Sequence, residues 1–437
     1  MFCGNASLIG QYSDFIPCGS GSNQFLDVAA KVTSVRLDKT LVNNLIKALL
    51  EVGKSIPGRI LFPALSALDC GGIPQDDLVT SLFAGSPIKT IAISGGDWGK
   101  TAPESRMLIS KLFATQSQVQ FLAADELTTP GLGSPEFWLL PGLRSLAYKG
   151  HLTFGDWANL IQNCPDLDSI AFEGSALGSN LPSPAPLHAP SLRRLDLTAF
   201  ESPDIVLFIL ESTNAPQLTA LDLFLDLEPE HTAVEHPSTS RLRAAFRVLS
   251  ERGCCLESLA LGTSINLGGE TLAAFRRLKS LDIRDWTSSC QLDDGDIDLL
   301  CHSLTELRRF YLEYNLFRSA STVYANITPR SFGSFARHCT ELTYLGLPVT
   351  AANPDDFIDT SFTELVPFRN NLRDLALTPL TLFVDKTNDF VSFLLVQCPN
   401  LGRLDIHLNA AHSWPSVSTL TRIERDMTID YFQRRLQ

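Results

Sequence analysis

The chain has 437 residues, a formal net charge of −13 at pH 7 and a pI near 5.1, and 44% of its residues are hydrophobic. This apolar content excludes an intrinsically disordered chain. The acidic balance argues against nucleic acid as the principal partner, because phosphate binding requires a clustered basic surface.

A short hydrophobic skeleton, L-x-x-L-x-L, recurs along the chain at spacings from 22 to 38 residues. In an extended segment its fourth and sixth positions point into one core, while the third and fifth face the other way. The first position is expected in the turn that enters the strand, packed inward from there. Recurrence at this period predicts a repeat array. Fourteen copies begin at Val32, Leu65, Ile88, Val119, Leu143, Leu167, Leu192, Leu218, Leu256, Leu278, Leu307, Leu342, Leu372 and Leu401.

Between these copies the hydrophobic period changes to that of an amphipathic helix. N-cap residues such as Thr153, Ser202 and Asn388 precede several of the helical segments. Each repeat therefore reads as a strand, a turn and a returning helix. This predicts an α/β solenoid, a horseshoe with a parallel sheet on its concave face and helices and loops on its convex face. The clearest helical segments are Phe154–Asn163, Pro203–Thr213, Arg241–Gly253 and Asp389–Cys398.

Two irregular segments and two ends complete the predicted organisation. Residues 174–191 contain four prolines between positions 182 and 190, which predicts a convex loop where other repeats have a helix. Residues 226–240 are predicted to form an acidic loop before the next helix. We expect an N-terminal cap at 1–30, the solenoid at 31–410 and a charged C-terminal cap helix at 411–437, because end repeats need a polar outer face.

The repeat resembles the leucine-rich repeat in its long, helix-containing form. Cys164, Cys339 and Cys398 each stand three residues before a strand. This position relative to the strand is similar to that in the cysteine-containing repeats of F-box proteins, in which a helix ends in a small buried cysteine. We interpret these cysteines as buried small hydrophobic residues, in preference to zinc ligands or disulfides, because they belong to separate repeats.

The irregular spacing resembles the fungal F-box-associated type of leucine-rich repeat protein, and residues 24–94 resemble the segment that follows the F-box there. The chain also departs from the standard repeat in that the usual Asn after each strand is matched only at Asn315 and Asn409, and this missing Asn ladder is part of the same resemblance. The resemblance implies the substrate-recognition part of an F-box-type ubiquitin ligase. We do not find the F-box itself, so cullin-adaptor binding is expected only if one is encoded upstream, and a ubiquitin-independent adaptor remains an alternative.

Targeting signals and cysteine usage predict a cytoplasmic or nuclear protein that does not enter a membrane. The sequence contains no run of ~18 apolar residues and its start lacks the charged and apolar regions of a signal peptide. Its ten cysteines include no C-x-x-C pair, which is typical of a reducing compartment.

Enzymatic motifs are weak. The segment Ser94–Thr101 has the layout of a phosphate-binding loop, but Ser94 replaces the first glycine, and Asp97 and Trp98 are poorly suited to a cradle of backbone amides. We keep a nucleotide-binding enzyme as a remote alternative. His231 and His236 are five residues apart and would not share a helix face. We therefore predict no enzyme activity, no cofactor and no metal.

The remaining candidate is a protein-binding site on the concave face, built from skeleton positions two, three and five. Arginine and tyrosine are enriched in binding hot spots, and the segment from 307 to 346 is the strongest candidate for contact. The alternative is that neighbouring Arg and Asp side chains neutralise one another. The predicted partner-binding residues are Arg193, Arg194, Asp196, Asp282, Arg308, Arg309, Tyr311, Tyr314, Tyr344, Arg373 and Arg403.

Overall fold

The computed structural model contains two compact units, Met1–Leu192 and Arg193–Gln437, which are described separately below. The residues that the structure describes are 27, 29–38, 60–71, 83, 85–94, 113, 114, 116, 118–125, 140–176, 186–199, 204–225, 237–263, 267–285, 292–314, 327–348, 367, 368, 371–377 and 396–406.

The first unit is a ladder of parallel strands in sequence order. Each strand pairs with the next one in register, so that Leu68 lies beside Ile91 and Leu146 beside Ile170. Among the elements that the structure describes there, helix α5 (Phe154–Asn163) and a short strand, β7 (Leu187–His188), accompany the ladder. The ladder strands are β1 (Ser34–Asp38), β2 (Ala67–Gly71), β3 (Thr90–Ser94), β4 (Phe121–Asp125), β5 (Ser145–Leu152) and β6 (Ser169–Ala176).

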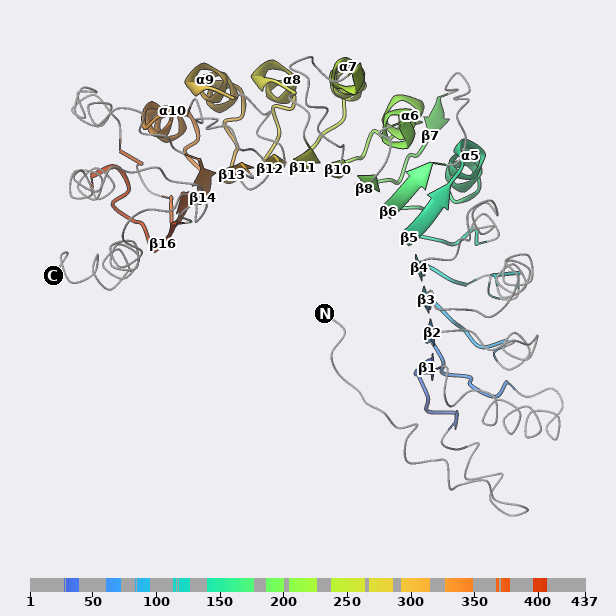
Figure 1. Ribbon diagram of the computed structural model, residues 1–437. Coiled ribbons are helices and arrows are strands. Elements are labelled where there is room, and N and C mark those ends of the chain that lie inside the picture. Colours follow the sequence, from blue (N-terminus) through green and yellow to red (C-terminus); the bar gives the residue numbers. More distant parts are fainter. Residues whose placement is uncertain are drawn as a thin grey trace, which may run out of the picture. The chain divides into compact units, whose positions relative to one another are not determined.

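The second unit repeats this design with helices between most of its strands (Figure 1). Its parallel strands are β8 (Arg194–Ala199), β10 (Ala220–Leu225), β11 (Ser258–Thr263), β12 (Ser280–Asp285), β13 (Arg309–Tyr314), β14 (Tyr344–Leu347), β15 (Asp374–Leu377) and β16 (Arg403–Ile406). Its helices are α6 (Asp204–Ser212), α7 (Pro237–Glu251), α8 (Gly269–Ala273), α9 (Asp294–Ser303) and α10 (Arg330–His338), and β9 (Thr213–Asn214) follows α6.

All fourteen predicted strands are present, and each begins two residues after the first position of its skeleton. That first position lies in the preceding turn and packs inward, as Leu192 and Leu278 show with no exposed surface. Positions four and six are buried as well, for example Leu195 and Leu197. The hydrophobic skeleton therefore specifies both the strand and the direction of its apolar side chains.

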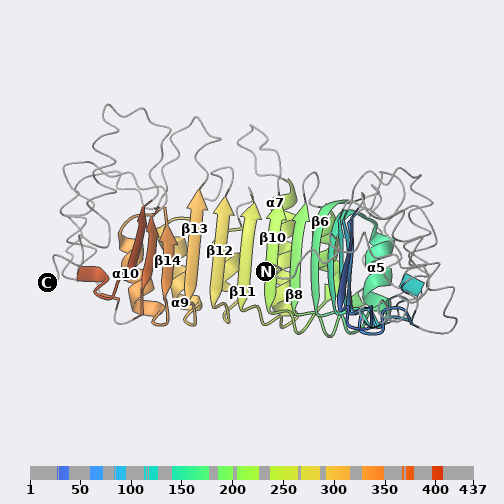
Figure 2. The same cartoon turned by 90° about the horizontal axis from the view of Figure 1, so that it is seen from below.

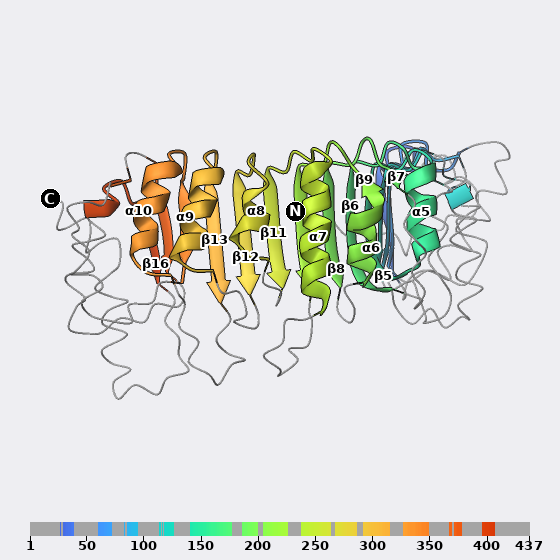
Figure 3. The same cartoon turned by 90° about the horizontal axis from the view of Figure 1, so that it is seen from above.

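The helices cover the buried side of the sheet in the second unit, as Figure 3 shows with α6 to α10 in front of the strands. Aromatic side chains join the two layers: the rings of Phe310 on β13 and Phe335 on α10 lie 4.9 Å apart. In the first unit, α5 has the predicted bounds. Thr153 caps it in a capping box with Asp156, which satisfies two backbone amides at the helix start.

The cysteines that end helices are buried, as the sequence analysis expected. Cys164 and Cys339 are the C-caps of α5 and α10, and each sulfur lies near a main-chain carbonyl of the preceding repeat, Leu140 for Cys164 and Leu304 for Cys339. Burial raises the pKa of Cys164 from 9.0 to about 11 and that of Cys398 to about 12. The neutral thiols thus act as small apolar residues with a weak donor that links consecutive repeats.

Several predicted features lie outside the described residues. These include most of the N-terminal cap 1–30, the C-terminal cap 411–437, positions 226–236 of the acidic loop and positions 177–185 of the proline-rich loop. Of the helix expected at Asp389–Cys398 only positions 396–398 are described; 396 and 397 are helical and Cys398 follows them. Within the described part of the chain, no helix is both long and apolar enough to cross a bilayer.

Candidate functional site

The candidate site lies on the open face, which we define as the side of the second unit's sheet opposite its helices (Figure 2). Skeleton positions three, five and seven form this face, because the buried leucines alternate with them. Parallel pairing aligns the third positions into one row and the fifth positions into another. From β8 to β16 the third-position row reads Arg194, Ala220, Ser258, Ser280, Arg309, Tyr344, Asp374 and Arg403, and from β8 to β15 the fifth-position row reads Asp196, Asp222, Ala260, Asp282, Tyr311, Gly346 and Ala376.

Part of this face is neutralised by cross-strand and same-strand ion pairs. Arg194 on β8 contacts Asp222 on β10 at 2.9 Å. Arg284, at position seven of β12, binds Asp282 through two nitrogens at 3.1 Å each. For these residues the arrangement favours the alternative interpretation, in which Arg and Asp balance each other on a solvated sheet.

Strands β13 and β14 carry a different arrangement, the tyrosine cluster, which comprises Arg309, Tyr311, Tyr344 and Gly346. The Arg309 Cζ atom lies 4.0 Å from the centroid of the Tyr344 ring, which is a cation–π geometry. The two tyrosine rings are 6.1 Å apart. A Cβ atom at Gly346 would overlap the Tyr311 ring, so the glycine allows this ring to lie over the neighbouring strand.

Tyr311 is anchored at its hydroxyl end. Its O–H donates to a Glu313 carboxylate oxygen at 2.9 Å. Partial burial, followed by this hydrogen bond, raises the pKa of Tyr311 above its ordinary value of 10.0. The hydroxyl group therefore stays protonated to a higher pH than that of an ordinary tyrosine and keeps donating to Glu313.

Arg309 differs from Arg194 and Arg284, the other arginines of the open face whose contacts are described above. Among the described residues no carboxylate lies within ion-pair distance of it, whereas Arg194 and Arg284 both have one. Its pairing neighbour on β12 is Ser280, a small side chain. The tyrosine cluster thus presents a cation and two aromatic rings together.

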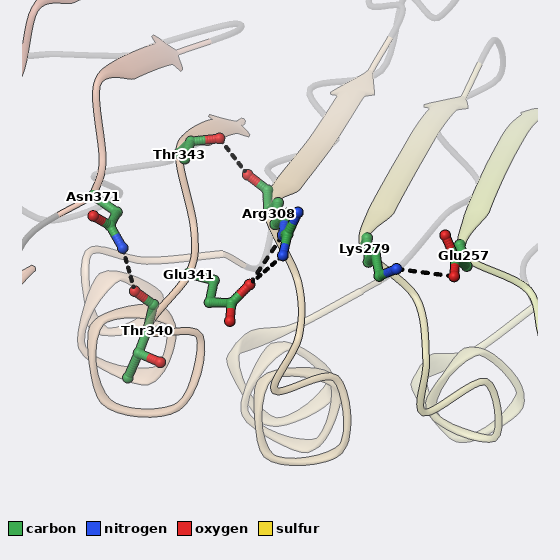
Figure 4. Close-up of polar contacts among 7 residues, drawn as sticks. All are labelled: Glu257, Lys279, Arg308, Thr340, Glu341, Thr343 and Asn371. Atoms are coloured by element: carbon green, nitrogen blue, oxygen red, sulfur yellow. Dashed lines mark hydrogen bonds and ion pairs between the residues drawn. The ribbon is translucent and has the colours of Figure 1, made fainter.

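A second charged row runs along the N-terminal ends of the strands, as Figure 4 shows. Lys279 contacts Glu257 at 2.9 Å, and Arg308 contacts Glu341 at 2.9 Å. From the skeleton alone, position two is expected on the strand face. The structure places it one residue before the strand, because each strand starts at position three, so Arg308 belongs to this edge.

The other predicted residues are dispersed. Arg193 and Arg373 precede β8 and β15 at position two, as Arg308 precedes β13. Arg403 begins β16 at the end of the third-position row. The side chain of Tyr314 lies outside the described residues, although its backbone ends β13.

The corresponding face of the first unit, on the side away from the buried skeleton positions, carries a row of small side chains together with the ion pairs Arg36–Asp69 and Lys149–Glu173. Position five of four consecutive strands is alanine (Ala92, Ala123, Ala147 and Ala171), aligned by parallel pairing. Phe121 stands out at position three, with 47% of its surface exposed. The sequence analysis did not identify this row, although aligning the fifth positions of the skeletons would have done so.

Sequence reasoning also missed the residues at position seven, and it missed Gly346 and Gly262, over which an aromatic ring of the adjacent strand lies. Glu313 and Arg284 lie at position seven, which the sequence analysis did not include in the face. Gly262 accommodates the ring of Phe224 from the adjacent strand, as Gly346 does for Tyr311. An aromatic residue and a glycine one repeat later in the same register are the available sequence signal.

The phosphate-binding-loop candidate lies outside the described residues except for Ser94, whose backbone ends β3. His231 and His236 lie outside them too. No group of three or more metal-ligating side chains occurs in the part of the chain that the structure describes. The expectations of no enzyme activity, no cofactor and no metal stay predictions.

The recurring skeleton, with one parallel strand per repeat and helices on the side of the buried leucines, defines an α/β leucine-rich repeat solenoid. No family model matches the chain, and no curated protein matches its sequence.

Solved structures similar to this chain include the TLR13–ssRNA13 complex and the Toll–Spätzle complex of Drosophila. Their identities are 15% and 14%, their TM-scores 0.41 and 0.39, and each covers 80% of this chain. The chain spans 43% and 48% of their respective lengths. The Rad7–Elc1 complex of yeast is 14% identical with a TM-score of 0.31, covering 88% of this chain and 79% of that one. Identities this low transfer no partner to this chain, and the exclusion of nucleic acid stays a prediction.

Proposed function

We propose that this chain is a protein-interaction scaffold that binds its partner on the open face of β12, β13 and β14. The observation that supports this most strongly is the tyrosine cluster, where Arg309 stacks on Tyr344 and Tyr311 lies over Gly346. Tyrosine and arginine supply large contact areas and dominate binding hot spots. A parallel sheet with one rigid strand per repeat holds them in fixed positions.

The ion pairs around the tyrosine cluster are suited to form the polar rim of a binding surface. Exposed pairs such as Arg194 with Asp222 contribute little net free energy, because solvent screens them. Hot spots are typically surrounded by energetically near-neutral contacts that exclude water. The tyrosine cluster is therefore assigned the role of anchor, and the paired residues that of boundary.

The finer proposal is that the scaffold recognises substrates for an F-box-type ubiquitin ligase. The buried cysteines at the helix ends support it, because Cys164 and Cys339 have the phase of cysteine-containing repeats and link adjacent repeats. The alternative is an adaptor that works without ubiquitin. Co-purification from cells that express the complete reading frame separates them: recovery of cullin subunits favours the ligase, and their absence favours the adaptor.

Quantitative affinity capture tests the scaffold itself. We expect the double variant Arg309→Glu, Tyr311→Ala to lose at least about fivefold of the partner signal, because each change removes an anchor. The control double variant Arg247→Glu, Leu299→Ala makes the same arginine charge reversal and removes an exposed apolar side chain on helices α7 and α9, and it should retain the partner signal. Equal partner recovery by both doubles and the wild type would refute the proposed surface.

A further inference from the structure

We propose that the segment bound at the tyrosine cluster carries an Asp or Glu side chain, and that Arg309 binds its carboxylate. The inference rests on the proposed function of the open face and names the chemistry of the partner. The partner is a protein segment in which the acidic residue stands next to an apolar one.

The charge arrangement of the open face supplies the first step. Arg194 and Arg284 already contact Asp222 and Asp282. Arg309 has no carboxylate within ion-pair distance among the described residues, and it contacts the Tyr344 ring instead. Its hydrogen-bonding capacity is thus available to a ligand.

The stacked geometry supplies the second step. A guanidinium over an aromatic ring uses its flat face for the ring and keeps its N–H edge for acceptors in its own plane. A carboxylate fits that edge with two parallel hydrogen bonds. Because the Tyr344 ring already holds the Arg309 side chain, binding immobilises less conformational freedom than at a solvated arginine.

The neighbours of Arg309 supply the third step. The third-position row on the β12 side continues with Ser280, Ser258 and Ala220, so small side chains separate Arg309 from Arg194. A partner segment can approach the sheet closely there. On the β14 side the half-buried rings of Tyr311 and Tyr344 offer apolar area to the residue beside the carboxylate.

The overall charge of −13 does not oppose this contact. At physiological salt the Debye length is about 8 Å, so carboxylates elsewhere on the chain are largely screened. A carboxylate in direct contact with Arg309 is screened much less.

Nucleic acid fits the site less well. A strand of RNA places phosphates in succession and needs several cations in a row. Here Asp374 follows Tyr344 in the third-position row, and Asp282 lies beside Tyr311 in the fifth. An arginine flanked by carboxylates in both rows suits one acidic side chain better than a run of phosphates.

Peptide display on the full chain tests the inference. A phage-displayed random peptide library is panned on the wild-type protein, and the selected peptides are measured on Arg309→Gln and on Arg194→Gln, a matched arginine of the same row. We expect the peptides to contain Asp or Glu beside an apolar residue. Their affinity should fall at least about tenfold on Arg309→Gln and stay within about twofold on Arg194→Gln. Circular dichroism melts establish that both variants fold.

The opposing outcomes separate this inference from the proposed function. Peptides without a carboxylate, unaffected by Arg309→Gln but weakened by Tyr344→Ala, would overturn the acidic partner and leave the binding surface in place. Peptides insensitive to both changes would overturn both. A short single-stranded RNA oligonucleotide that binds more tightly than the peptides, and that requires Arg309, would overturn the assignment of a protein partner.

Discussion

The position of the Tyr311 ring depends on the absence of a side chain at Gly346. The ring lies over the glycine and its hydroxyl group donates to Glu313, so the ring is held at both ends. The sequence predicted both Tyr311 and Tyr344 as contact residues from their skeleton positions. It did not predict the role of Gly346. That role depends on which residue of β14 pairs with Tyr311 on β13, and the skeletons of these two strands begin 35 residues apart.

Gly346→Ala should displace the Tyr311 ring and weaken partner binding by at least about fivefold, or about 1 kcal/mol. The same change at Gly402 meets the Arg373 carbonyl at an ordinary 3.5 Å and is the matched control. Affinity is measured on the partner recovered by capture, and stability by urea unfolding. Undiminished binding by Gly346→Ala would show that the ring position is irrelevant.

At the scale of elements, the helices of the second unit are joined by carboxylates of α9. Asp294 accepts hydrogen bonds from the Thr328 amide at 2.9 Å and the Thr328 hydroxyl at 2.6 Å, and from the Ser331 hydroxyl. Asp296 accepts from the Gly269 amide at the start of α8 at 3.2 Å. One helix therefore caps the beginnings of both neighbours.

The Asn that commonly follows each strand in leucine-rich repeats is expected at only two positions of this chain. The two candidate positions, Asn315 and Asn409, lie outside the described residues. The strands themselves were predictable because the buried leucines dictate them. The helix-to-helix contacts were not, since an Asp in a first helical turn serves equally well as an ordinary favourable charge near the helix start.

Asp294→Ala should lower the free energy of unfolding by about 2 kcal/mol, because it leaves the half-buried Thr328 amide without its acceptor. Asp294→Asn retains an acceptor oxygen and should cost less. Urea unfolding curves measure both, with Asp166→Ala, an exposed turn residue after α5, as control. A loss no larger than that of the control would contradict the capping role.

At the scale of the whole chain, the two units share one repeat and differ in their open faces. The first unit presents the alanine row with Phe121 and the ion pairs Arg36–Asp69 and Lys149–Glu173, and the second presents the tyrosine cluster among its ion pairs. The buried skeleton positions are apolar in both units, and they determine the shared fold. The difference between the two surfaces comes from positions three, five and seven. The fold was therefore predictable from the sequence. The site was predictable only as a set of candidates, because cross-strand pairing decides which arginines are neutralised.

The most direct test of the proposed binding surface is site-specific photo-crosslinking in cells. The photoreactive residue p-benzoylphenylalanine is placed at Ser280, on the open face next to Arg309, or at Leu299, which is exposed on helix α9. We predict a covalent partner adduct from the Ser280 position and none from the Leu299 position. An adduct from Leu299 alone would place the partner on the helix side and contradict the proposed surface.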